Sequence, residues 1–213
     1  MQEWVRLEDM QRAGFPMGGE PLVALDLADT QMLAAEPPVD LIDSPAAGAT
    51  WWALQASRLP EGPAPSLEAT RTLRAAIRDV FDAHLAGRPS QDTSLEDINA
   101  AAAAVPTSPR IVRSQAGTIT QTRWHTEQGG NAALAAVAHE TIGLFASPER
   151  LAALRRCANP SCSMLFLAAT KRRTWCAANV CGNRVRVARH YERTRDEAHN
   201  NPRTSTGEGR PLR

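Results

Sequence analysis

The chain has 213 residues, of which 43% are hydrophobic and 22% charged, and its formal net charge is +1. This length suits one ordinary domain with a smaller one attached. No run of about 18 apolar residues occurs, which excludes a membrane-spanning helix. The start, MQEWVRLEDM, lacks the cationic and apolar regions of an export signal, so we expect a cytoplasmic protein.

The N-terminal part begins with a segment, residues 1–17, that we expect to be poorly ordered. Residues 22–32 (LVALDLADTQM) are short and apolar, so periodicity alone does not separate strand from helix, although the leucine spacing favours helix. Asp26 and Asp29 could form a ligand-binding pair. We favour helix caps and surface acids for them instead.

The strongest helical pattern runs from Leu67 to Leu85, where apolar residues recur at three- and four-residue steps. Ser66 precedes it as an N-cap, and Gly87 is placed to end it. Three arginines fall mostly on the opposite side of this helix, where we expect a solvated face. They are Arg71, Arg74 and Arg78.

Weaker patterns predict the remaining elements of this domain. We expect helices over residues 46–59, from Thr93 or Ser94 to Val105 with a capping box, over 131–146, and over 148–156. Alternation about Gly117 predicts a β-hairpin of residues 110–113 and 118–124. The pair His139-Glu140 lacks the second histidine of a metalloprotease motif, because position 143 is Gly. His125 and Glu127 have no nucleophile motif around them, so we do not expect an enzyme.

All four cysteines lie within 25 residues, as two pairs, Cys157-x4-Cys162 and Cys176-x4-Cys181, separated by thirteen residues. Two tight knuckles that each deliver two thiolates are the usual design of a structural zinc site. The alternative is two disulfides, for which three connectivities exist. A reducing compartment favours Zn2+. We therefore predict Cys157, Cys162, Cys176 and Cys181 as metal ligands.

The cysteine region also predicts its own local fold. Residues 164–167 form a short apolar run that could pair back with residues 172–175, with 168–171 as the turn. A helix is expected over 182–198. Two knuckles, a hairpin and a following helix describe a treble-clef-like finger.

Charge separates the two ends of the chain. Residues 1–154 carry eleven bases and nineteen acids, whereas residues 155–195 carry ten bases and one acid. Such asymmetry is typical of nucleic-acid-binding proteins, and arginine suits bidentate contacts to phosphate and guanine. The residues that we predict to bind nucleic acid are Arg172, Arg173, Arg184, Arg186, Arg189 and Arg193.

These arginines have an alternative interpretation. A helix over 182–198 would place Arg186, Arg189 and Arg193 on one face, ready to dock into a major groove or along a backbone. Arg184 and its neighbours could instead bond knuckle carbonyls or pair with the acidic part of the chain.

The segment CANPSC, followed by FLAATKRRTWCAANVCGNRVRVARHYERTR, resembles the CGNR zinc finger, which in bacterial proteins follows an N-terminal region called the ABATE domain. Upstream, GGEPLVALDLADT resembles the opening of that domain. The resemblance runs from Gly18 to about Arg195 and implies a transcription regulator, because the family is described as stress-induced transcription regulators. Two positions depart from the family pattern. Ala168 stands where Asp is common, and Asp29 stands where Asn is common.

Taken together, these observations predict a mainly α protein: a helical domain with a small β-hairpin over residues 18–150, then a treble-clef-like zinc finger with four cysteine ligands over 151–198. We expect residues 199–213 to be poorly ordered. The expected function is that of a Zn2+-containing, DNA-binding bacterial transcriptional regulator whose helical domain senses a small-molecule effector or forms a homodimer. The alternative is a zinc-stabilised protein- or RNA-interaction module without sequence-specific DNA binding.

Overall fold

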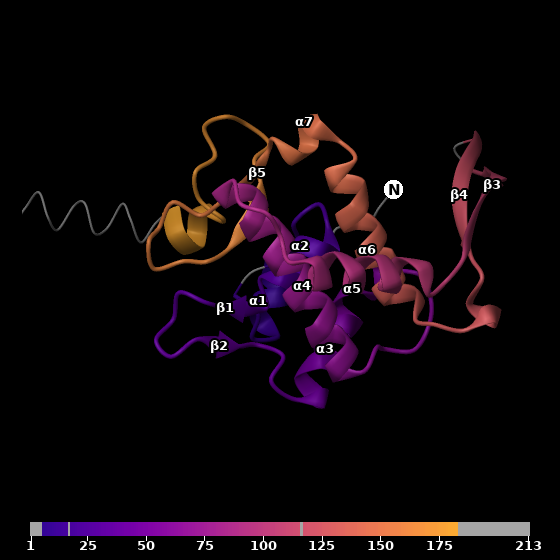
Figure 1. The fold of residues 1–213 in the computed structure, drawn as a ribbon, viewed down its shortest axis with the longest axis horizontal. Helices are drawn as coiled ribbons and strands as arrows, with labels where there is room; N and C mark the ends of the chain where they lie inside the picture. Colours follow the sequence, from indigo (N-terminus) through magenta and orange to yellow (C-terminus); the bar gives the residue numbers. More distant parts are fainter. Residues whose placement is uncertain (1–5, 17, 116, 183–213) are drawn as a thin grey trace, which may run out of the picture.

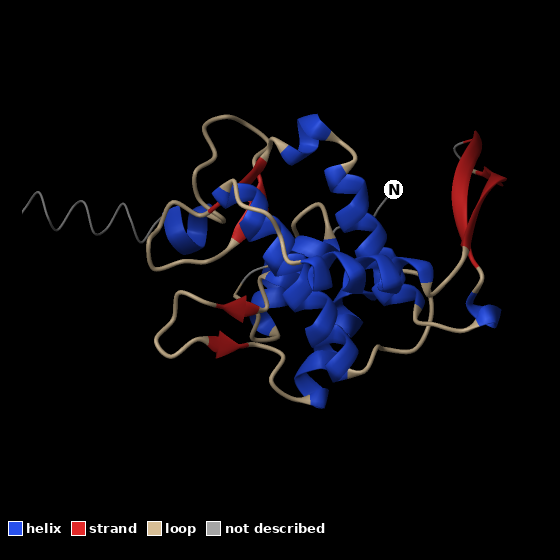
Figure 2. Cartoon of the chain, viewed as in Figure 1, coloured by secondary structure: helices blue, strands red, loops and turns tan. Residues whose placement is uncertain are grey.

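The computed structural model describes residues 6–16, 18–115 and 117–182, and it is mainly helical (Figures 1 and 2). Its helices and helical turns are α1 (Leu7–Arg12), α2 (Val23–Ala28), α3 (Pro45–Gln55), η1 (Ala56–Arg58), α4 (Leu67–Ala86), α5 (Asp92–Ala103), η2 (Thr126–Gln128), α6 (Ala132–Phe145), α7 (Pro148–Leu151) and the π-helical turn η3 (Ala178–Gly182). Its strands are β1 (Gln31–Met32), β2 (Val39–Asp40), β3 (Thr107–Ser114), β4 (Gly117–Trp124), β5 (Leu154–Arg156) and β6 (Leu165–Leu167). They pair as antiparallel hairpins, β1–β2, β3–β4 and β5–β6. The expectation of a mainly α protein with small hairpins is confirmed.

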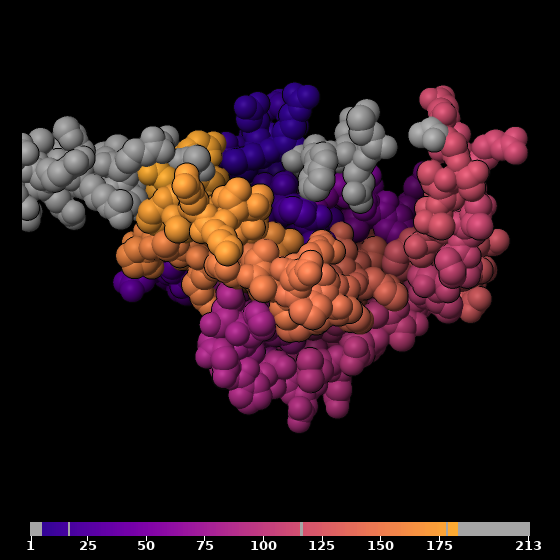
Figure 3. Space-filling model, turned by 90° about the horizontal axis from the view of Figure 1, so that it is seen from above, coloured from indigo at the N-terminus to yellow at the C-terminus, as the bar shows by residue number. Residues whose placement is uncertain are grey.

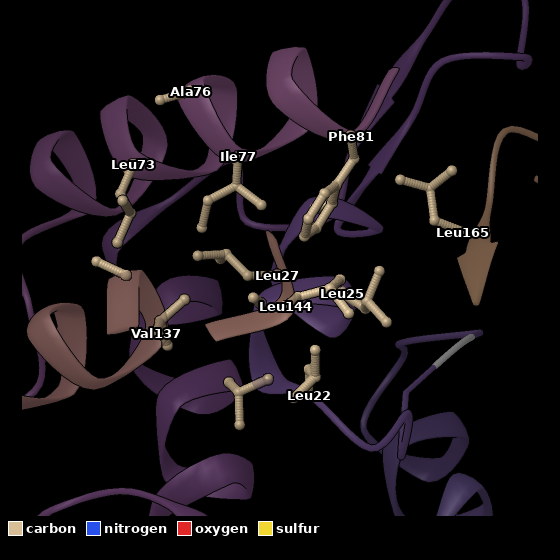
Figure 4. Close-up of a cluster of buried hydrophobic side chains, with 14 of the residues drawn as sticks. Leu22, Leu25, Leu27, Leu73, Ala76, Ile77, Phe81, Val137, Leu144 and Leu165 are labelled. Atoms are coloured by element: carbon tan, nitrogen blue, oxygen red, sulfur yellow. The ribbon is translucent and has the colours of Figure 1, made fainter. Parts of the chain in front are cut away.

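Helix α2 forms the centre of the core. All six of its residues are buried, and it packs on α4, α6 and β6. Figure 4 shows Leu27 of α2 facing Ile77 of α4 and Leu25 of α2 beneath Phe81. Five of the six residues of α2 are apolar, and a helix with so little polar surface is stable only when it is enclosed. The prediction of a helix in this segment is confirmed, although the helix ends at Ala28 and residues 31–32 form strand β1.

Local capping explains where the longer helices begin and end. Ser44 and Ser66 each accept a hydrogen bond from a backbone amide of the following first turn, at 3.3 and 3.2 Å. Gly87 ends α4 in the left-handed region, with φ 64°. Helix α5 differs from the prediction, because Gln91 precedes it without a side-chain cap. Its start is held from α4 instead, where an Asp79 oxygen accepts the Gln91 amide at 2.8 Å.

The arginines of α4 correct the expectation of a solvated face. Arg74 and Arg78 are only 4% and 5% exposed. Arg74 donates two hydrogen bonds to Asp40, of 2.6 and 2.7 Å, and so fixes the β1–β2 hairpin against α4. A guanidinium can be buried when a carboxylate accepts its hydrogen bonds. The hydrophobic pattern could not predict this buried ion pair, because a pattern distinguishes polar from apolar positions and does not show which polar side chains have a buried partner.

The segment after α6 is also different from the prediction. Helix α7 ends at Leu151, and residues 154–156 form strand β5, which pairs antiparallel with β6. Strand β6 therefore pairs with an upstream strand, not with residues 172–175. The reason is burial: Leu154, Leu165 and Leu167 join the core of the helical domain, and Figure 4 shows Leu165 near Phe81.

The structure describes part of the N-terminal segment, residues 1–17, but not the C-terminal segment after residue 182. Within residues 1–17, Met10 of α1 and Phe15, which follows that helix, pack into the core and are 0% and 4% exposed. The expected helix over 182–198 and the tail over 199–213 lie outside the described residues. No helix in the described part of the chain is long and apolar enough to cross a membrane.

Glu140 of α6 supplies the cap that α2 lacks. Leu22 precedes α2 and has no side-chain cap, and a Glu140 carboxylate oxygen accepts the Ala24 amide at 3.0 Å. A carboxylate at a helix N-terminus satisfies free amides and complements the helix dipole. The central helix is thus held at its start by a distant part of the chain.

Replacing Glu140 with Ala should lower the free energy of unfolding by about 1–2 kcal/mol, because the α2 amide loses its acceptor. Urea unfolding monitored by tryptophan fluorescence measures this. Glu149→Ala, on the exposed start of α7, is the matched control and should change stability by less than about 0.5 kcal/mol. Equal effects of the two substitutions would contradict the capping role.

Candidate metal centre

The four cysteines gather at one point although they come from separate segments. Cys157 follows β5, Cys162 and Cys176 lie in loops, and Cys181 lies in η3. Their sulfur atoms all lie within 4.8 Å of one another, and all four thiols are free. Sulfur atoms bound 2.3 Å from a single tetrahedral Zn2+ are about 3.8 Å apart. The Cys162 and Cys176 sulfurs are already 3.9 Å apart, so this arrangement suits one shared ion.

Backbone hydrogen bonds shape the two knuckles. The Cys162 amide donates to the Asn159 carbonyl at 2.9 Å, and the Cys181 amide donates to the Ala177 carbonyl at 3.1 Å. The Asn159 side chain serves both knuckles: its oxygen accepts the Ser161 amide, and its nitrogen lies 3.5 Å from the Cys181 sulfur. An amide that donates to a sulfur stabilises a thiolate there.

The cluster is mostly enclosed. Cys157, Cys176 and Cys181 are 5%, 2% and 1% exposed, and Cys162 is the more accessible member. Apolar side chains wrap the group; they are Met32, Met164, Phe166, Trp175 and Val180. The hydrogen bond with the Cys176 thiol lowers the pKa of Cys162 to about 5. A thiolate is therefore readily formed at the most accessible of the four cysteines.

Two buried carboxylates attach this metal centre to the helical domain. The Leu165 and Leu167 amides of β6 point away from β5, because alternate amides of a strand face opposite edges. Both Asp29 oxygens accept the Leu165 amide at 3.0 Å, and a Glu20 oxygen accepts the Leu167 amide at 3.1 Å. The carboxylates thus act in place of a neighbouring strand, and we call these two hydrogen-bonded positions the carboxylate seat.

Two arginines complete the carboxylate seat. Arg78 donates to the Ser163 carbonyl at 2.7 Å and lies 3.5 Å from Asp29. Arg173 donates to Glu20 at 2.6 Å and to the Leu167 carbonyl at 3.0 Å, and its guanidinium lies 4.4 Å from the centre of the Phe166 ring. Burial raises the pKa of both carboxyls, well above the usual range for Asp29. The arginines oppose that shift, Arg78 at Asp29 and Arg173 at Glu20.

Asp26 holds the backbone at Glu20, one of the two acids of the carboxylate seat. Its two oxygens accept the Gly19 and Glu20 amides at 2.9 and 3.0 Å, and it pairs with Arg58 at 2.7 Å. Asp26 and Asp29 are 4% and 3% exposed, so the favoured interpretation as surface acids is wrong. The signal for their role was present in the sequence, as carboxylates within an otherwise apolar segment.

The predicted nucleic-acid residues fall into three groups. Arg172 is exposed. Arg173 is committed to Glu20 and to carbonyl groups within the finger. The others, Arg184, Arg186, Arg189 and Arg193, lie outside the described residues. Sequence reasoning missed Glu20 and Arg78 as residues that position the finger.

Cobalt substitution tests the ligand set. The reduced protein, stripped of metal and titrated with Co2+, should develop the visible absorption of tetrahedral thiolate ligation, and added Zn2+ should displace the cobalt. Cys176→Ser should lose most of this absorption, whereas Ser161→Ala, a knuckle substitution without a sulfur, should retain it. A cobalt spectrum unchanged in Cys176→Ser would contradict the four-cysteine assignment.

Substitutions at Asp29 test the carboxylate seat. Asp29→Asn keeps an oxygen for the Leu165 amide and removes a buried charge, so stability at pH 7 should change by less than about 1.5 kcal/mol. Asp29→Ala leaves that amide without an acceptor and removes the buried carboxylate that lies 3.5 Å from the Arg78 guanidinium, so it should cost about 3–5 kcal/mol. Urea unfolding of the zinc-loaded protein measures both values, and equal values would contradict the carboxylate seat.

The stability difference between the natural protein and Asp29→Asn should depend on pH. The folded-state pKa of Asp29 is raised above its unfolded value, which is about 3.9, so the folded protein binds the Asp29 proton more readily. The stability of the natural protein relative to Asp29→Asn should therefore rise as pH falls from neutral toward about 4. Unfolding measured across that range checks this, and a relative stability that falls would contradict the raised pKa.

Comparison with known families agrees with this geometry. Residues 22–148 match the model of the ABATE family, described as "Putative stress-induced transcription regulator", and residues 153–194 match the CGNR zinc finger. A search of curated proteins gave no match. A CGNR zinc finger whose four cysteines lie within reach of one ion makes Zn2+ the cofactor of this chain. The chain belongs to the ABATE family and ends in a CGNR zinc finger.

Proposed function

We propose that this protein is a zinc-dependent, DNA-binding transcriptional regulator. In this proposal, Cys157, Cys162, Cys176 and Cys181 hold one Zn2+, and the arginine-rich segment that follows them contacts DNA. The observation that carries the proposal is the convergence of four thiols immediately before residues 184–195, which contain five arginines and one acid. Because the last cysteine directly precedes the basic segment, a metal ion bound by the cysteines would fix the point at which that segment begins.

The carboxylate seat supports this proposal. Because Asp29 and Glu20 hold β6 against the helical domain, the metal site is part of a rigid body and not a tethered module. A fixed starting point reduces the conformational freedom that the arginine-rich segment would lose on binding, and pre-organisation of this kind improves affinity.

The proposed DNA-contacting set differs from the full set of predicted arginines. Arg172 is exposed and stays in the set, together with Arg184, Arg186, Arg189 and Arg193. Arg173 leaves it, because Glu20 and the finger carbonyls use its guanidinium. The zinc ion, when bound, supplies structural rigidity and no open coordination position for chemistry.

The helical domain offers a candidate effector site. A groove of about 400 Å³ lies between α4, α5 and α6. Ile142 and Phe145 are each 39% exposed on its wall. A volume of this size fits a small organic molecule. Effector sensing by the domain therefore forms part of the proposal.

One observation favours the alternative of a protein-interaction module. The Arg173–Glu20 pair shows that an arginine of the finger can bind the acidic helical domain of its own chain. If the later arginines did the same, they would be used for anchoring and not for DNA.

Binding to duplex DNA separates the two functions. Zinc-loaded protein should select sequences from random duplexes, and its affinity for a selected duplex should fall steeply with added salt. Changing Arg186 and Arg189 to Ala should weaken binding and reduce the salt slope by about 2, because each lost phosphate contact removes about 0.9. Fluorescence anisotropy of a labelled duplex measures both quantities.

Two control variants make this experiment decisive. Arg203→Ala with Arg210→Ala removes the same charge beyond the residues that match the finger and should leave the slope nearly unchanged. Cys176→Ser should bind much more weakly, since the arginine segment loses its fixed start. Equal binding by the Arg186/Arg189 variant and the natural protein would favour the interaction module.

A further inference from the structure

The β3–β4 hairpin stands apart from the helical domain. In Figures 1 and 3 it projects from the end of the molecule opposite the finger. Nearly all of its residues are exposed or half-buried, and Ile111 is 75% exposed. Contact with the domain occurs at the base, where Trp124 packs with Val105, Ala132 and Ala135. A two-stranded hairpin without a covered face is marginally stable on its own.

The hairpin is also basic within an acidic domain. Residues 98–126 contain three arginines and no acidic residue. The rest of residues 1–154 carries eight bases and nineteen acids. The charge of this projection is therefore opposite to that of the domain that carries it, which points to a negatively charged partner.

The hairpin arginines differ from most of the arginines elsewhere in the domain. Arg58, Arg74 and Arg88 each form an ion pair with an aspartate. In contrast, neither Arg113 nor Arg123 forms an ion pair within the described part of the chain, although the charge of Arg123 contributes to the lowered pKa of the nearby Glu127 carboxyl. The third hairpin arginine, Arg110, donates to the neutral Gln121 side chain at 2.8 Å.

The strand register distributes these groups over both faces. Arg110 lies opposite Gln121, and Ser108 lies opposite Arg123, so these four share one face. Arg113 lies opposite Thr118 and shares the other face with a row of threonines, Thr118, Thr120 and Thr122. Arginine, glutamine, serine and threonine are the side chains that bond phosphates and base edges.

We propose that the β3–β4 hairpin is a second DNA contact, a two-stranded ribbon that binds duplex DNA independently of the zinc finger. The major groove admits a two-stranded ribbon, and the exposed Ile111 suits contact with thymine methyl groups. A second copy of the chain is a poorer occupant, because symmetric pairing of two hairpins would bring like charges together. The inference rests on the proposed DNA binding for its partner but uses a separate set of residues.

A charge-removal variant tests this contact in the full-length, zinc-loaded protein. Arg110→Gln, Arg113→Gln and Arg123→Gln combined should weaken binding to a selected duplex by about tenfold or more and reduce the salt slope by about 2–3. The matched control removes the same charge elsewhere in the domain, by combining Arg6→Gln before α1, Arg12→Gln in α1 and Arg150→Gln in α7. This control should leave the salt slope unchanged. Replacing the three hairpin arginines with Lys should restore most of the slope, because lysine still binds phosphate.

The outcomes separate this inference from the proposed finger contact. If the hairpin variant binds like its control while the Arg186/Arg189 variant is weak, the hairpin inference is overturned and the finger stands. The reverse pattern supports the hairpin and removes the finger. If hairpin substitutions change the oligomeric state in sedimentation but not DNA affinity, the surface pairs chains and the inference fails. It also fails if the natural protein binds no duplex.

Discussion

The contact between two buried carboxylates and the free edge of β6 is the interaction on which the rest of the structure depends. Asp29 and Glu20 accept the Leu165 and Leu167 amides, and Arg78 and Arg173 balance the charges from either side. Hydrogen bonds to charged groups contribute about 1.5–3 kcal/mol each. A carboxylate can satisfy a strand edge without a neighbouring strand, so a short hairpin can end directly against helices. The finger and the helical domain thereby share one core.

The zinc site and the carboxylate seat constrain different parts of the finger. The four thiols hold the two knuckle loops, which have little regular structure of their own, whereas the carboxylate seat holds β6 and, through the ladder, β5. Leu165 and Leu167 add apolar burial on the same strand.

The sequence predicted features with local causes and missed those with distant ones. The cysteine spacing predicted the metal cluster, and Ser66 and Gly87 predicted the ends of α4, because each effect lies within a few residues. The pairing of β6 with β5 was missed because the apolar run preceding Ala168 fits either neighbour equally well. The burial of Asp29 was also missed. Its partners are the Arg78 guanidinium and an amide of the finger, and neither can be inferred from composition or periodicity.

Amide hydrogen exchange at Leu165 and Leu167 tests most directly whether the finger is built into the helical domain. In the zinc-loaded protein, both amides should be protected to nearly the same extent as the core amides of α4, because buried carboxylates hold them. Protection should be far greater than for the exposed β3–β4 hairpin. Leu165 and Leu167 amides that exchange as fast as those of that hairpin would show that the finger opens freely, and would contradict this account.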